Sequence, residues 1–285
     1  MTPFDPTICT LGEGPLWHPQ RDELFWFDIT GKALYARKDG ATRQWRFDRH
    51  FSAAGWVDET TLIIASQDAL WRFDIDTGGK DRICDLDADN PVTRSNDGRA
   101  DPWGGFWIGT MGINAKKYAG AIYRYYKGEL RTLFTGITVS NTICFAPDQS
   151  CAYYSDTMSR RIMQVALDPA TGWPTGAPGV AIDLREAGLN PDGAITDVDG
   201  NLWVACWGAG IVLQITLAGT QLQRISVPVT QPSCPAFGGP DFTDLYVTSA
   251  TQGLSAGTLA AQPLNGATFC IEGVAKGRPD PRVIL

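Results

Sequence analysis

Histidine is almost absent from this chain of 285 residues, which contains only His18 and His50. Two imidazole rings exclude a zinc site built from several histidines, and they disfavour a Ser-His-Asp catalytic triad. The sequence also lacks a Walker phosphate-binding loop and the G-x-G-x-x-G dinucleotide fingerprint. These absences remove several common classes of enzyme from consideration.

Charge and long apolar runs are also scarce. Charged residues make up 19% of the chain, the formal charge is -7, and no Lys/Arg cluster stands out, so we expect neither nucleic acid nor a membrane surface as a partner. No apolar run approaches the roughly 18 residues of a transmembrane helix, and residues 1–11 do not resemble a secretory signal. Seven cysteines without a C-x-x-C pair indicate reduced thiols, which predicts a cytoplasmic protein.

The chain has little helical periodicity and contains short aromatic and β-branched runs instead. They are bounded by Gly, Pro, Asp and Asn, and their starts lie about 38 to 50 residues apart, which is the size of a four-stranded propeller blade. The runs occupy residues 24–28, 62–65, 106–110, 152–156, 202–205 and 245–248. We therefore predict an all-β protein in which residues 1–285 form one six-bladed β-propeller of antiparallel blades around a central channel. An irregular pair of β-sandwiches is the alternative, and an N-terminal strand is expected to close the ring.

Four polar residues recur at one phase of this repeat, each about 10 or 11 residues before an apolar run. They are Glu13, Asn96, Asn141 and Asp192. Equal phase in a circular repeat means equal height and equal distance from the axis, so we expect these side chains to converge. Taken singly, each is also an ordinary turn residue. Together, their carboxylate and amide oxygens suit a hard divalent cation.

The other two blades carry different residues at this phase. Blade two has Phe51 or Ser52 there, and blade six has Cys234 or Pro235. None of these is a ligand for a hard cation, so an ion would be held from part of the ring only.

The motifs around the polar residues resemble those of the regucalcin/gluconolactonase (senescence-marker-protein) family, in order through nearly the whole chain. The matching segments are Gly12-Glu13-Gly14-Pro15-Leu16-Trp17, Arg94-Ser95-Asn96-Asp97-Gly98, Gly109-Thr110-Met111, Val139-Ser140-Asn141, Asn190-Pro191-Asp192-Gly193 and Phe237-Gly238-Gly239. The resemblance implies a six-bladed propeller that hydrolyses sugar lactones to aldonic acids. It also implies one divalent ion in the channel, with Ca, Zn, Mg, Mn and Fe(II) all open as its identity.

The resemblance also assigns roles to residues. Glu13, Asn141 and Asp192 correspond to the family's metal ligands, and Asp192 also to its proposed catalytic acid/base. Arg94 and Asn96 correspond to substrate-binding residues. The expected partner is a small sugar lactone, bound by a monomer or weak oligomer.

One position departs from the family pattern. Several members carry a glutamate four residues before a Gly-Ala-Leu-Tyr-like segment, where it contacts substrate hydroxyls. The corresponding residue here is Lys116, in the loop 113–119. This loop cannot supply an acidic contact, which leaves the particular sugar open, although Lys116 is also typical of a solvated loop.

Three other functions remain open at this point. The same site would serve a non-enzymatic cation-binding protein, used for buffering or regulation. A phosphotriesterase-like or arylesterase-like propeller hydrolase shares the fold, although some of those enzymes use a channel histidine. A protein-interaction propeller is disfavoured by the polar channel residues and by the absence of Trp-Asp repeat dipeptides.

Overall fold

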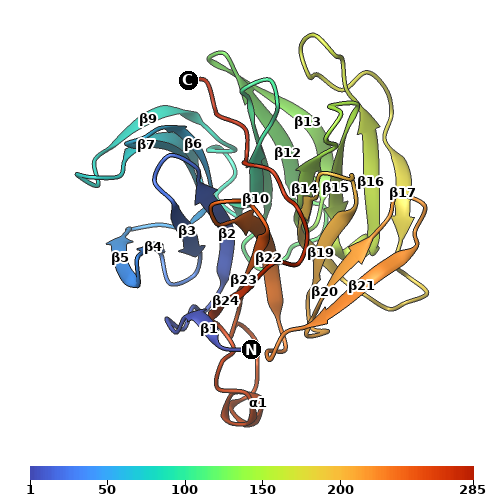
Figure 1. The fold of residues 1–285 in the computed structure, drawn as a ribbon. Coiled ribbons are helices and arrows are strands. Elements are labelled where there is room, and N and C mark those ends of the chain that lie inside the picture. The colour runs from blue at the N-terminus through green and yellow to red at the C-terminus, as the bar shows by residue number, and fades with distance from the viewer.

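The computed structural model describes residues 1–285 and shows six four-stranded antiparallel sheets arranged as the blades of a propeller (Figure 1). This confirms the predicted fold class. Blades one to three contain β2 (Gly12–His18), β3 (Glu23–Asp28), β4 (Ala33–Lys38), β5 (Ala41–Arg46), β6 (Phe51–Asp58), β7 (Thr61–Ser66), β8 (Ala69–Asp74), β9 (Lys80–Asp85), β10 (Thr93–Ala100), β11 (Phe106–Gly112), β12 (Gly120–Tyr126) and β13 (Glu129–Ile137). Blades four and five contain β14 (Ser140–Phe145), β15 (Cys151–Asp156), β16 (Arg161–Ala166), β17 (Gly179–Asp183), β18 (Pro191–Thr196), β19 (Leu202–Cys206), β20 (Ile211–Ile215) and β21 (Gln221–Ser226).

The sixth blade joins the two ends of the chain. Its strands are β22 (Pro232–Gly238), β23 (Asp244–Ser249), β24 (Thr268–Ile271) and β1 (Pro3–Asp5). The N-terminal strand β1 pairs antiparallel with β24. The predicted closure of the ring by an N-terminal strand is therefore confirmed, because these hydrogen bonds hold the segment that leads into blade one against the last blade.

The strands near the axis are more buried than the outermost strands of each blade. The apolar runs that the sequence shows are therefore found on inner strands. Every residue of the first strands β2, β10, β14 and β18 is buried. The outermost strands are mostly exposed and polar. Strands buried on both faces lose the alternation of apolar and polar residues. Polar residues on the first strands are therefore functional candidates, because burial of a polar group is unfavourable without a partner.

A separate hydrophobic cluster fills each of the six interfaces between neighbouring blades. Trp26, Trp107 and Trp203 lie on the second strands of blades one, three and five, and all three are fully buried. These large rings pack between blades, where they remove most apolar surface from water. The clusters hold the blades at fixed angles and so fix the positions of the first strands around the axis.

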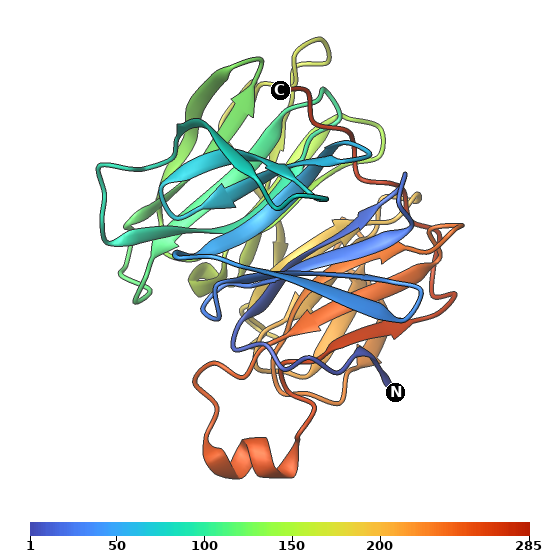
Figure 2. The same cartoon turned by 90° about the vertical axis from the view of Figure 1, so that its left-hand side faces the viewer.

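The C-terminal segment, residues 274–285, crosses the end of the propeller opposite the single α-helix (Figures 1 and 2). It forms no helix or strand. Asp280 accepts two hydrogen bonds of 3.1 Å from Nη1 of Arg99, a residue of the first strand of blade three. Val283 is fully buried, and its amide donates to the backbone oxygen of Trp56 in blade two. A cavity of only about 30 Å³ remains beneath the segment at Arg99 and Asp280.

Substitution of Asp280 by alanine is expected to lower the free energy of unfolding by about 3 kcal/mol, because it leaves a buried guanidinium without its carboxylate. The Arg99 contacts to the backbone oxygens of Ile143 and Ala194, at 3.2 and 3.3 Å, remain and limit the loss. Urea unfolding measures the change. Asp199→Ala removes an exposed carboxylate and is the matched control, with an expected change within about 0.5 kcal/mol. Equal stability of the two variants would contradict a stabilising role for the ion pair between Arg99 and Asp280.

The α-helix, α1 (Ala256–Ala261), projects from blade six between β23 and β24 (Figure 1). Residues 253–257 match the G-x-S-x-G pattern of a nucleophile elbow, but Ser255 instead caps α1, where its Oγ accepts the amide hydrogen of the residue three positions later. The rings of His18 and His50 hydrogen-bond to groups of blade two. Ser255 therefore has no histidine base. No helix is long and apolar enough to span a membrane.

Candidate active site

The first strands of several blades contain a bulge at the phase of the predicted site residues. In blade one the register shifts between Glu13 and Leu16, and in blade four it shifts between Asn141 and Cys144. Residues with positive φ follow the polar residues directly: Gly14 has a φ of 54° and Thr142 a φ of 62°. A bulge breaks the strict alternation of a strand and redirects the neighbouring side chain. The bulges thereby turn these polar side chains toward the axis.

Lack of space excludes a side chain at both Gly14 and Gly193, and Gly14 also has a positive φ of 54°. A Cβ atom on Gly14 would lie 2.3 Å from the backbone oxygen of Ser52, and one on Gly193 would lie 2.3 Å from Sγ of Cys234. Both glycines directly follow a predicted metal ligand. The neighbouring first strands can approach one another closely only because these side chains are absent.

One cavity of about 370 Å³ is lined by all five residues that the sequence singles out. They are Glu13, Arg94, Asn96, Asn141 and Asp192, contributed by the first strands of blades one, three, four and five. Each is 5% exposed or less. The convergence expected from the repeat is present in the structure, and the separate roles of the five residues remain predictions.

A chain of hydrogen bonds crosses the cavity from blade three to blade five. Nη1 of Arg94 donates to Oδ1 of Asn96 at 2.8 Å, and Nδ2 of Asn96 donates to Oδ1 of Asn141 at 3.0 Å. Nδ2 of Asn141 then donates to Oγ1 of Thr157 at 2.8 Å, and that hydroxyl donates to the backbone oxygen of Pro191 at 2.7 Å. The chain fixes the orientation of both amides. Oδ1 of Asn141 keeps a second lone pair for another partner.

The buried carboxylates of Glu13 and Asp192 line this cavity together with one buried guanidinium, that of Arg94. Burial raises the pKa of Glu13 to about 8, and the charge of Asp97 adds to the shift. Burial also raises the pKa of Asp192 well above its usual range, with the charge of Glu13 as the next cause. Burial lowers the pKa of Arg94 to about 10, opposed by the charges of Glu13 and Asp192. An excess of buried negative charge is costly, and a bound cation would relieve it.

These donors fit a hard divalent cation. The structure brings together no group of three His, Cys, Asp or Glu side chains, so a cation site here depends on the amide oxygen of Asn141 as well as on Glu13 and Asp192. Two carboxylates and an amide are all hard oxygen donors. Their charges would balance that of a divalent ion, and they leave coordination positions for other ligands.

Several residues of the site are not marked by the repeat. Thr157 lies in the short 3-10 helix η1 (Thr157–Ser159) that follows blade four's second strand, where no phase argument applies. Oγ1 of Thr142 donates to the backbone oxygen of Asp192 at 2.6 Å and so supports that strand from blade four. Asp97 accepts the amide hydrogen of Ile143 at 2.7 Å, and burial raises its pKa to about 6. The resemblance motif contained Asp97, but nothing in its spacing distinguished it from its neighbours.

The loop 113–119 contributes little to the cavity. Ala115 is its only residue in the lining, and Lys116 is exposed and forms no hydrogen bond through its side chain. The backbone of Lys116 packs against Gly112, where an added Cβ atom would lie 2.7 Å from the Lys116 nitrogen. Lys116 is thus a solvated loop residue, and the acidic contact of the family pattern has no counterpart in this loop.

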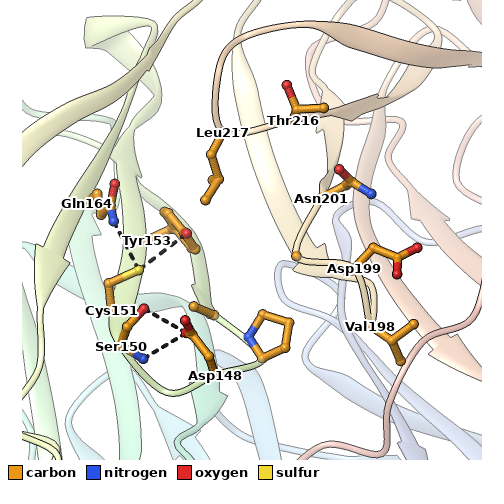
Figure 3. A pocket seen from close by; sticks show the side chains of 13 residues that line it. Asp148, Ser150, Cys151, Tyr153, Gln164, Val198, Asp199, Asn201, Thr216 and Leu217 are labelled. Carbon is orange, nitrogen blue, oxygen red and sulfur yellow. Dashed lines mark hydrogen bonds between the residues drawn. The ribbon is translucent and has the colours of Figure 1, made fainter.

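A second cavity, of about 440 Å³, lies between blades four and five at the opposite ends of their first strands (Figure 3). Its acidic residues are Asp148 and Asp199, and no basic side chain lines it. The Asp148 carboxylate already accepts hydrogen bonds from the amide and hydroxyl of Ser150 (Figure 3). No set of unpartnered polar groups converges here, so the cavity containing Glu13 and Asp192 is the candidate active site.

The fold and this cavity define a six-bladed propeller with a buried, carboxylate-containing site at one end of its axis. Residues 11–251 match the SMP-30/gluconolactonase/LRE-like region, and the chain belongs to that family. The predicted family resemblance is confirmed.

Known proteins similar over nearly the whole chain agree with this membership. A protein of Rhizobium meliloti (strain 1021) assigned as a sugar lactone lactonase is 40% identical, covering 95% of this chain and 92% of that protein. The 6-deoxy-6-sulfogluconolactonase of Pseudomonas putida is 32% identical, covering 95% and 94%. The crystal structure of a calcium-binding protein, regucalcin, from Agrobacterium tumefaciens has a TM-score of 0.97 and 38% identity, covering 99% and 97%. At the level of enzyme class, the two lactonases bear out the expectation of a lactone-hydrolysing enzyme.

Proposed function

We propose that the protein hydrolyses a sugar lactone to the corresponding aldonic acid with the help of one divalent cation. The observation that carries the proposal is the convergence of Glu13, Arg94, Asn96, Asn141 and Asp192 on one cavity of about 370 Å³. That volume lies in the usual range for small-molecule sites, roughly 300–1,000 Å³. The names of the relatives support a lactone as the substrate class.

Glu13, Asn141 and Asp192 would hold the cation. When bound, such an ion supplies Lewis acidity that polarises an ester carbonyl and stabilises negative charge on its oxygen. The chain itself prepares the ligands: Thr157 orients the Asn141 amide, and Thr142 holds the Asp192 backbone.

Arg94 and Asn96 would position the lactone. Nη1 of Arg94 already bonds to Asn96 and to the backbone oxygen of Ser95, which leaves Nε and Nη2 for substrate oxygens. Because both residues are buried and linked by hydrogen bonds, their geometry is set before the substrate arrives. Such preorganisation lowers the entropic cost of reaching the reactive arrangement.

Asp192 would act as the acid/base. Its carboxylate accepts a proton from water as the water oxygen bonds to the lactone carbonyl carbon, and it returns a proton to the ring oxygen as the carbon–oxygen bond breaks. The product is a hydroxy acid, which loses its carboxyl proton at neutral pH. Burial raises the pKa of Asp192, whereas a cation held by the same carboxylate would lower it, so the basicity of this group would depend on both effects.

A panel of neutral five- and six-carbon aldonolactones, assayed by acid release with Ca²⁺, Mg²⁺, Mn²⁺ and Zn²⁺ in turn, tests the proposal. We expect at least one lactone to be hydrolysed well above its spontaneous rate, and only with a divalent ion present. Arg94→Lys is expected to raise KM by roughly tenfold, because lysine lacks the forked donors. Protein that binds the ion but accelerates no lactone would instead support a non-enzymatic cation-binding function.

A further inference from the structure

Arg160 lies at the mouth of the candidate active site, between blades four and five. It directly follows η1 and has a φ of 54°. Its Nε donates a hydrogen bond of 2.9 Å to Oδ1 of Asn190, and Nδ2 of Asn190 donates to the backbone oxygen of Trp207 at 3.3 Å. All three residues line the cavity. The guanidinium is thus held at the cavity through Nε, while its two Nη atoms form no hydrogen bond with the protein.

Arg160 is also without an ion pair, unlike Arg161 and Arg185 of the same blade region. Arg161 and Arg185 both pair with Asp183, at 3.3 and 2.6 Å, on the outer side of blade four. The difference is one of placement, because Arg160 alone of the three lines the cavity. A guanidinium fixed by a neutral amide, with its forked donors unused, is suited to bind an anionic group.

The charges of the cavity lining point the same way. Its charged residues are Glu13, Arg94, Arg160 and Asp192. A divalent cation held by the two carboxylates would neutralise both of them, and the two guanidiniums would then leave the cavity positive. Arg94 is buried near the carboxylates, whereas Arg160 is exposed at the mouth. A substrate with a negative charge at the end farther from its reacting carbonyl would complement this arrangement.

We propose that Arg160 is a specificity-determining residue that binds the terminal anionic group of an acidic sugar lactone. This inference rests on the proposed function: Glu13 and Asp192 are buried and Arg160 is exposed at the mouth of the same cavity, so a lactone whose carbonyl lies at the two carboxylates can place its last carbon near Arg160. The lactones that Arg160 would bind all carry an anionic group on that carbon, which can be a carboxylate, a sulfonate or a phosphate. Asn190 is a positioning residue, because it acts by holding the guanidinium.

The experiment compares kcat/KM for neutral D-glucono-1,5-lactone with that for three acidic relatives: D-glucaro-1,4-lactone, 6-phospho-D-glucono-1,5-lactone and 6-deoxy-6-sulfo-D-gluconolactone. We expect wild-type protein to favour at least one acidic lactone. In Arg160→Gln the ratio of acidic to neutral kcat/KM should fall roughly tenfold, the effect of losing a charged hydrogen bond. Arg160→Lys should give an intermediate ratio, because lysine retains the charge without the fork. The matched control Arg161→Gln should keep the wild-type ratio.

A binding measurement separates this inference from the catalytic proposal. Isothermal titration with D-glucarate and D-gluconate, the dianionic and monoanionic acids, should show tighter binding of D-glucarate by wild-type protein and loss of that difference in Arg160→Gln. Charge-dependent binding without turnover of any lactone would retain the anion site and reject the lactonase. A preference for the neutral lactone over all three acidic ones, or an unchanged ratio in Arg160→Gln, would reject the assignment of Arg160.

Discussion

Asp192→Asn is expected to reduce kcat for lactone hydrolysis by roughly 10³-fold or more, the scale of losing an acid/base group and a metal ligand together. Asparagine keeps the shape of the side chain but neither accepts a proton at neutral pH nor carries charge. Steady-state assays with the best lactone of the panel, at saturating metal, measure the effect. The loss should appear in kcat and kcat/KM alike if the carboxylate acts mainly on the transition state.

The fold should tolerate this substitution. Asp192 and Glu13 are both buried, and the charge of Glu13 contributes to raising the pKa of Asp192 because the two carboxylates repel each other. Removal of one carboxylate relieves that repulsion, so thermal unfolding of the metal-free variant should occur at or above the wild-type temperature. Asp199→Asn, an exposed change in the same blade, is the matched control and should retain full turnover. An Asp192→Asn protein with wild-type kcat would reject the role assigned to this residue.

Removal of divalent ions is expected to abolish hydrolysis, and addition of one suitable ion should restore it. The physical reason is that the carboxylates of Glu13 and Asp192 are buried, and Arg94 is the only buried positive charge that lines the cavity with them. The same ion should stabilise the fold: at 100 times its Kd it adds about 2.7 kcal/mol, which corresponds to a rise in Tm of roughly 5 °C. Differential scanning calorimetry and metal analysis of the chelated protein measure both effects.

Glu13→Gln provides the specific test of the proposed cation site, since it removes one charged ligand and keeps the side-chain volume. Its Tm should respond much less to the ion than that of wild-type protein. Asp148→Asn changes an exposed carboxylate of the second cavity and should leave the Tm response intact. Full activity in protein shown by metal analysis to be ion-free would contradict a metal-dependent mechanism.

The sequence predicted the six blades because each blade contains an apolar second strand at nearly constant spacing. That regularity has a physical origin: every blade packs against two neighbours in the same way, so each needs a similar buried strand, such as β3 with Trp26 or β11 with Trp107. The same regularity predicted the convergence of Glu13, Asn96, Asn141 and Asp192. Residues at the same position of a sequence repeat occupy equivalent positions around the axis, and this can be predicted without a structure.

Residues outside the repeat could not be found in this way. Thr157 lies in a turn of 3-10 helix, and its contact with Asn141 depends on how that turn folds back over blade four. Asp280 reaches Arg99 across 181 positions of the chain, in a segment without regular structure. Neither contact has a local sequence signal, because no periodicity relates the partners.

The sequence by itself determined the number of blades, the family and the residues that meet at the axis, since each follows from a repeated pattern or from an ordered set of motifs. Only the tertiary structure decided the environment of those residues. It showed that Glu13 and Asp192 are buried together, that a chain of amides and hydroxyls orients Asn141, and that Arg160 lacks an ion pair while Arg161 has one. Burial and pairing are properties of neighbours brought together by folding, and two adjacent arginines look alike until their neighbours are known.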